Sequence, residues 1–267
     1  MKKFIFVLFA TLASICSAHA QFVDGTNGLL TAPSAEFEAD ATIRVSTNFL
    51  NKHYTSTTWD YHTMGYAVSA SLFGRLEIAY SCTVFNDKWK PGHVAPDPDR
   101  DDEYDMVNQD RHFAARFALT KEGEWGIDWL PAIAIGTSDP VTGTGGDYSH
   151  GNIGGEGNGY FNRYYLVAMK SFETPWGPAA GHLGYQHSMR TDGMPKGLIA
   201  AVSWKPVWLN QADSFLSSSR VIAEYDARFV NLGMTAGVWD DHIELMAMLL
   251  GMQYPMFGAR FKFSLSH

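Results

Sequence analysis

Segments in which apolar residues alternate with polar or small ones recur along most of this sequence. Met64, Tyr66, Val68 and Ala70, for example, alternate with Thr63, Gly65, Ala67 and Ser69. Successive side chains of a β-strand point to opposite faces of its sheet, so such a segment predicts a strand with one apolar face. The segments run over roughly 9 to 11 residues, the length of a strand that crosses a membrane. The pattern therefore favours amphipathic membrane-spanning strands.

Twelve such segments can be placed along the chain. They cover residues 42–50, 62–72, 75–85, 111–120, 127–136, 161–171, 179–189, 196–205, 219–226, 229–238, 242–250 and 256–265. Bacterial outer-membrane barrels have an even number of strands. We therefore predict an all-β chain that forms a single antiparallel transmembrane β-barrel of about 12 strands, of the outer-membrane type. The apolar set Val68, Ile78, Phe117, Val202 and Phe261 is expected to face lipid.

The connections between these segments differ in length according to their order. Odd-numbered connections include the long stretches Asn51–Tyr61, Asn86–Asp110 and Thr137–Tyr160, whereas even-numbered ones include the short Phe73-Gly74 and Trp239–Asp241. Outer-membrane barrels have long extracellular loops and short periplasmic turns. The order therefore predicts that both ends of the barrel sequence lie in the periplasm. A soluble β-sandwich is the alternative, but its loops need not sort in this way.

The first residues are typical of an export signal. Lys2 and Lys3 precede the apolar run Phe4–Ala13, and Ala18-His19-Ala20 is a small-x-small cleavage site. We expect a signal peptide over residues 1–20, a periplasmic entry segment over 21–41 and an outer-membrane barrel over 42–267. The formal net charge of −8 argues against nucleic acid as a partner, because phosphate binding needs a basic face.

Charged residues on the expected inward faces are the first candidates for function. By alternation this set comprises Arg44, Arg75, Glu77, Arg116, Glu224, Asp226, Glu244, Arg260 and Lys262, with Arg228 at a turn. One hypothesis is a polar, glycan-contacting lumen. The other is a network of ion pairs, because buried charges must be matched. In either case we expect Glu224 and Asp226 to pair with inward basic residues.

Motifs for catalysis or metal binding are weak. A histidine followed by a serine two positions later on a strand would suit a lipid hydrolase, and none of the ten histidines is followed by serine at this spacing. His182 and His187 are five apart, which does not suit a metal site. The acidic stretch Asp97–Asp105 lacks the glycine of a calcium loop, and the glycines of Thr142–Gly159 lack the spacing of a phosphate-binding loop. We predict no enzymatic activity, no metal and no cofactor.

Two parts of the sequence resemble one known family. The run Gly28-Leu29-Leu30-Thr31-Ala32-Pro33-Ser34-Ala35 is similar to the Gly-Leu-x-x-Thr-Pro-Ser-Ala entry motif of YjbH-type outer-membrane proteins, with Ala32 at a position where threonine is usual. The matching residues are Gly28, Leu29, Thr31, Pro33, Ser34 and Ala35. The segment Val221–Asp226, followed by Asn231-Leu232-Gly233, is similar to the family's Glu-Tyr-Asp strand and the Asn-x-Gly start of its next strand.

The resemblance implies a function in exopolysaccharide production. We therefore expect a non-enzymatic protein of the outer membrane that serves the production or export of cell-surface polysaccharide. Its expected partners are outer-membrane lipid, polysaccharide and other polysaccharide-export proteins, and no nucleic acid. A passive porin-like or structural barrel is the alternative, and a lipid-modifying barrel enzyme is the third hypothesis.

Overall fold

The computed structural model describes residues 23–55, 62–86, 106–140, 160–189, 193–210 and 216–265. The expected signal peptide, the acidic stretch Asp97–Asp105 and the glycine-rich stretch Thr142–Gly159 lie outside the described residues. No helix in the described part of the chain is long and apolar enough to span a membrane.

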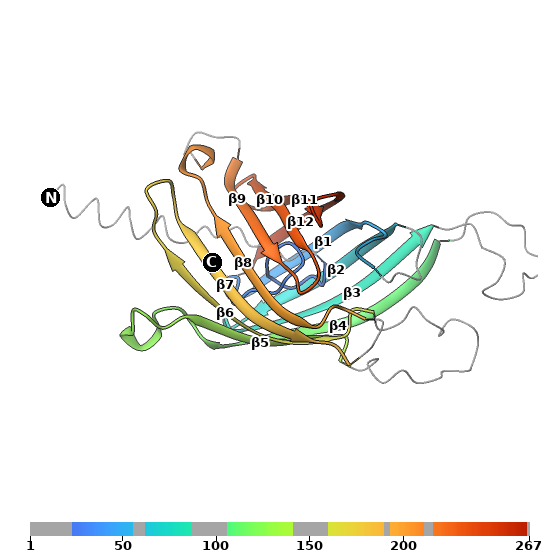
Figure 1. Cartoon of the computed structure of the whole chain (residues 1–267), viewed down its shortest axis with the longest axis horizontal. Coiled ribbons are helices and arrows are strands. Elements are labelled where there is room, and N and C mark those ends of the chain that lie inside the picture. The colour runs from blue at the N-terminus through green and yellow to red at the C-terminus, as the bar shows by residue number, and fades with distance from the viewer. Residues whose placement is uncertain are drawn as a thin grey trace, which may run out of the picture.

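The described residues form twelve strands and two short 3-10 helices (Figure 1). The elements are β1 (Thr42–Leu50), β2 (Thr63–Leu72), β3 (Leu76–Asn86), β4 (Met106–Thr120), η1 (Glu124–Gly126), β5 (Ala132–Ser138), β6 (Arg163–Phe172), β7 (Ala179–His187), β8 (Gly197–Trp204), η3 (Val207–Leu209), β9 (Leu216–Tyr225), β10 (Val230–Val238), β11 (Ile243–Leu250) and β12 (Tyr254–Ser264). Each strand pairs with the next along the chain, and β12 pairs with β1. The predicted twelve-strand antiparallel barrel is confirmed.

The barrel has two distinct ends. We call the end at which β1 begins and β12 ends the turn end, and the opposite end, which carries the β1–β2 and other odd-numbered connections, the loop end. Most strand boundaries agree with the prediction to within three residues. Two boundaries were wrong: β4 begins five residues earlier than expected, and β5 begins at Ala132 rather than residue 127. The amide N–H of Ile127 bonds to the carbonyl of Glu124, so the expected start of β5 continues the turn around η1 instead.

The alternation of exposed and buried residues follows the prediction. Val68 in β2 is 52% exposed, whereas Ser69 is 3% exposed. Ile78, Phe117 and Val202 are exposed on the same outer surface. Phe261 is half-buried, because its ring packs against those of Trp239 and Phe263. The outer wall is thus the apolar face and the inner wall carries most of the polar residues.

Strand β11 departs from this rule. Its inward residues Met246, Met248 and Leu250 are buried and apolar, while Leu245 and Leu249 are exposed on the outer face. A strand that is apolar on both faces must contact apolar material inside the barrel as well as outside. The inner wall of β11 therefore requires an apolar occupant of the lumen.

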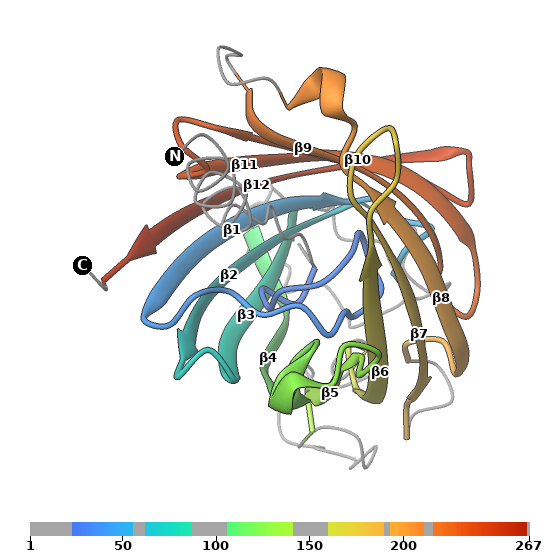
Figure 2. The same cartoon turned by 90° about the vertical axis from the view of Figure 1, so that its left-hand side faces the viewer.

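That occupant is the N-terminal segment, which lies inside the ring of strands (Figure 2). We call residues 23–38 the plug. All of them are buried except Glu36 and Phe37, which are half-buried. The entry segment that was expected in the periplasm thus occupies the lumen of the barrel. The prediction was wrong because strand alternation carries no information about irregular segments.

Candidate functional site

The tip of the plug is a tight hairpin built from the YjbH-like motif. Gly28 and Pro33 form an isolated antiparallel bridge. Between them, the amide N–H of Leu29 donates to the carbonyl of Ala32 over 2.9 Å. The turn leaves the next amides, from Leu30 onward, free to donate outward. It therefore presents several N–H groups at the tip of the hairpin.

Glu224 in β9 accepts these N–H groups. Its carboxylate receives the amides of Leu30 at 2.9 Å, Thr31 at 2.8 Å and Ala32 at 3.3 Å. The hydroxyl of Thr31 adds a fourth bond of 2.6 Å. Successive backbone N–H groups that converge in this way form an anion-binding concavity, here filled by a carboxylate of the same chain. Glu224 thus fixes the tip of the plug to the barrel wall.

Two neighbouring side chains complete this contact, and we call Glu224, Asp226 and Asn231 the tip site. The carboxamide of Asn231 donates to Glu224 over 3.1 Å and to Asp226 over 3.2 Å. The Thr31 hydroxyl lies 3.2 Å from the carboxylate of Asp226. The two sequence motifs that resemble the family, about 190 residues apart, therefore bind each other.

The expected pairing of the tip site was wrong. Among the described residues, no arginine or lysine forms an ion pair with Glu224 or Asp226. Neutral donors from the plug replace the basic partners that alternation suggested. Hydrogen bonds from N–H and O–H groups stabilise a buried carboxylate as a counter-charge does.

Gly233 of β10 makes room for the plug. A Cβ atom at this position would lie 2.9 Å from Leu30 and 2.7 Å from the Cβ of Met248. Any larger residue would therefore displace either the plug tip or the neighbouring strand. The glycine of the Asn-x-Gly motif is explained by this close approach.

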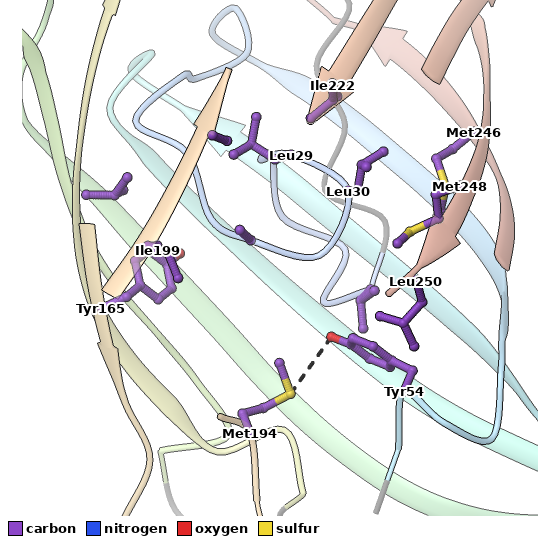
Figure 3. Packing of buried hydrophobic residues seen from close by; sticks show 14 of the residues in the cluster. Leu29, Leu30, Tyr54, Tyr165, Met194, Ile199, Ile222, Met246, Met248 and Leu250 are labelled. Atoms are coloured by element: carbon purple, nitrogen blue, oxygen red, sulfur yellow. Dashed lines mark hydrogen bonds between the residues drawn. The ribbon is translucent and has the colours of Figure 1, made fainter. Parts of the chain in front are cut away.

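The apolar side chains of the plug tip pack against the inner faces of β9 and β11. Leu29 and Leu30 belong to one buried cluster with Ile222, Met246 and Met248 (Figure 3). Leu29 is 1% exposed and Leu30 is fully buried. Burial of a leucine side chain contributes about 2 kcal/mol, so the two leucines add substantially to plug binding.

The body of the plug is held by arginines of the barrel wall. Asp24 forms an ion pair with Arg163 of β6. Glu36 lies 2.6 Å from Arg220 of β9. Both guanidinium groups are buried from solvent.

Near the turn end, Glu77 of β3 is the centre of a second set of contacts. Its carboxylate lies 2.8 Å from Arg116 and 3.2 Å from Arg44, and it accepts the amide of Asn27 over 2.9 Å. Arg116 in turn donates to the carbonyls of Asn27 over 2.5 Å and Ser34 over 2.7 Å. Wall and plug thus share one hydrogen-bonded network.

A further buried ion pair lies on the last two strands. Glu244 of β11 lies 3.4 Å from Arg260 of β12, and Arg260 donates to the carbonyl of Thr26 over 3.4 Å. Together with the contacts of Glu77, this pair agrees with the hypothesis of an ionic network that fills the interior.

Two predicted lumen residues lie elsewhere, and a third lies at the turn end of the inner wall. Lys262 is directly opposite Arg44 in the pairing of β1 with β12, so it shares the inward face, and it is half-buried near the end of β12. Arg75 precedes β3 and forms an ion pair with Glu124, the first residue of η1, at the turn end. Arg228 lies in the turn between β9 and β10, where Ala227 adopts a φ of 74°. The turn carries Arg228 away from the inward face of β9.

Arg228 belongs to a cluster that covers the plug at the loop end. It donates to the carbonyl of Tyr54 over 3.0 Å and lies 3.4 Å from the hydroxyl of Tyr160. The Tyr160 hydroxyl also donates to the Tyr54 carbonyl, and the Tyr54 hydroxyl bonds to the sulfur of Met194. Burial raises the pKa of both Tyr54 and Tyr160, so both hydroxyls keep their protons and act as donors.

One histidine inside the barrel, His182, contacts two serines. Nδ1 of His182 is 3.3 Å from the hydroxyl of Ser34, and Nε2 is 3.2 Å from the hydroxyl of Ser203. Ser34 also accepts the amide N–H of Glu36 over 3.1 Å and is fully buried. In the part of the chain that the structure covers, no group of three or more metal-ligating side chains occurs.

Two wall arginines that hold the plug, Arg163 and Arg220, were not among the residues predicted from the sequence. Arg220 is four residues before Glu224 on the same strand, so alternation places both on one face, and this signal was present. Arg163 begins β6, which carries apolar residues on both faces, so alternation gave it no direction. The acidic residues of the plug were missed because their segment was expected outside the barrel.

Comparisons with known proteins agree with the motif resemblance. The YjbH family model, described as exopolysaccharide biosynthesis protein YbjH, matches residues 21–195. No curated protein matches the chain. Among solved structures, LpxR from Salmonella typhimurium is similar with a TM-score of 0.39 and 10% identity, over 84% of this chain and 100% of that chain. Since the family model spans well over half of the sequence, the chain belongs to the YjbH exopolysaccharide biosynthesis family.

Proposed function

We propose that this protein is a non-enzymatic component of exopolysaccharide production that acts in the outer membrane as a barrel closed by its own plug. The observation that carries the proposal is the seating of the family motif on Glu224 inside the lumen. Family membership supplies the link to exopolysaccharide, and the barrel with an apolar outer wall supplies the link to the outer membrane. Polysaccharide and other polysaccharide-export proteins are the partners that this function would involve.

The two other hypotheses fit the site less well. A passive porin needs an open lumen, whereas the plug is bonded to the wall at both ends of the barrel. A lipid-modifying enzyme needs a nucleophile that substrate can reach. The best candidate, Ser34, is fully buried, and its hydroxyl already accepts the amide of Glu36.

Complementation of a deletion strain tests the proposal. We expect loss of the gene to lower surface exopolysaccharide and the wild-type gene to restore it. Ser34→Ala and His182→Gln should also restore output, because neither residue has a chemical role in the proposal. Gly233→Leu, which obstructs the seat of Leu30, should fail to restore output.

Heat-modifiability on a gel, which reports a folded barrel, is the control for every variant. Unchanged exopolysaccharide in the deletion strain contradicts the proposed function. A folded Ser34→Ala barrel that restores no output contradicts the non-enzymatic part and favours catalysis by Ser34.

A further inference from the structure

The plug is acidic, and each of its charges faces an arginine of the wall. Residues 23–38 contain three acidic side chains and no basic one. Asp24 pairs with Arg163 and Glu36 with Arg220, as described above. The third, Glu38, lies 3.6 Å from Arg44.

These arginines lie at successive levels along the lumen. Arg44 is the third residue of β1 and lies near the turn end. Arg220 is the fifth of the ten residues of β9, and Arg163 begins β6 at the loop end. A line of guanidinium groups therefore follows the plug from one end of the barrel to the other.

Two of these arginines depend on the plug for their counter-charge. Within the described residues, Asp24 is the one carboxylate that forms an ion pair with Arg163, and Glu36 is the one that pairs with Arg220. Arg116 and Arg260 differ, because they have the wall carboxylates of Glu77 and Glu244. Removal of the plug would leave two guanidinium groups of the inner wall without a carboxylate partner, and a replacement anion would restore both ion pairs.

The tip site has a different requirement. Glu224 and Asp226 accept hydrogen bonds from neutral amide and hydroxyl groups of the plug tip, and the carboxamide of Asn231 donates to the Thr31 hydroxyl. A ligand that replaces the whole plug must therefore offer carboxylates to the arginines and hydroxyls to the tip site. A simple anion lacks the hydroxyls, and a neutral glycan lacks the charge.

We propose that the plug is an internal substitute for an acidic polysaccharide, and that the lumen binds such a polymer in its place. The arginines that hold Asp24 and Glu36 would take sugar carboxylates, and the tip site would take sugar hydroxyls. This inference rests on the proposed function and specifies the chemical class of the polysaccharide. Bidentate pairing with carboxylates is the interaction that guanidinium groups favour.

Accessibility of the plug tests the inference in the full-length protein. Ser34→Cys, made together with Cys16→Ala and Cys82→Ala, places a single reporter thiol in the plug at a position that is fully buried. The purified variant in lipid vesicles is treated with a membrane-impermeant maleimide. One sample also contains a hexamer of galacturonic acid, and the other contains maltohexaose. We expect the acidic hexamer to accelerate labelling at least five-fold and maltohexaose to leave the rate unchanged.

Two controls complete the design. Phe73→Cys, at an exposed turn, should label at the same rate with either sugar. Adding Arg163→Gln and Arg220→Gln to the reporter variant should abolish the difference between the two sugars. If Ser34→Cys fails to fold, Ala35→Cys is the second reporter, because Ala35 is 4% exposed in the same segment.

Equal labelling with both sugars, or no acceleration by the acidic hexamer, overturns the inference. Either result leaves the proposed function intact if the deletion strain still loses exopolysaccharide. Normal output from that strain instead removes the proposed function, whatever the labelling shows. The two failures are therefore distinguishable.

Discussion

At the scale of the residue, Glu224 accepts backbone hydrogen bonds from three consecutive plug residues, Leu30, Thr31 and Ala32. Glu224→Gln preserves the size of the side chain but places an NH2 group against those donors. We expect unfolding free energy to fall by about 2 to 3 kcal/mol, since buried donors lose their acceptor. Chemical denaturation in detergent measures the change.

Two further variants check this account of Glu224. Thr31→Val, which removes only the hydroxyl shared by the tip site, should cost about 1 kcal/mol. Glu173→Gln neutralises an exposed carboxylate of the turn between β6 and β7 and serves as the matched control, with an effect below about 0.5 kcal/mol. A Glu224→Gln barrel as stable as the control would show that the plug tip is not held through this carboxylate.

At the scale of the element, the pairing of β8 with β9 is the shortest in the barrel. Only five residue pairs join these strands, from Ala200–Tyr225 to Trp204–Val221. Beyond these pairs, the side chain of Asn210 makes the hydrogen bonds to β9 that a neighbouring strand would make. Its carboxamide accepts the amide of Ser219 over 2.6 Å and donates to the Ser219 carbonyl over 3.2 Å.

Asn210→Ala should therefore weaken this seam. Both backbone groups of Ser219 lose their partner, and we expect a loss of about 1 to 3 kcal/mol. The effect is measured as the midpoint temperature at which the band of the folded barrel disappears from the gel. Gln253→Ala, at an exposed turn, is the control. Equal midpoints for the two variants would contradict the role of Asn210.

At the scale of the whole molecule, closure of the barrel separates an apolar outer wall from a filled interior. Val68→Cys, made with Cys16→Ala and Cys82→Ala, should react in lipid vesicles with a lipid-soluble maleimide and resist a charged, impermeant one, because Val68 lies on the outer wall. Phe73→Cys, at the turn end, should react with both reagents. Rapid reaction of Val68→Cys with the impermeant reagent would contradict the membrane placement of this wall.

The sequence alone determined the strands and their inward and outward faces, because a period of two follows directly from backbone geometry. It placed Arg44, Glu77 and Glu244 correctly on the inner wall. It also contained one signal of an apolar interior, the run Leu245–Leu250, whose two apolar faces are inconsistent with a water-filled lumen.

Only the tertiary structure decided what those inward groups bind. The plug is irregular, so no periodicity reports its position, and the partners of Glu224 lie some 190 residues away in the chain. Closure of the twelve strands places β9 and β10 beside the N-terminal hairpin. Glu224 therefore binds backbone amides of the plug instead of the basic side chains that the sequence predicted. Contacts that depend on ring closure are set by the whole fold, whereas the face of a strand is set by its nearest neighbours in sequence.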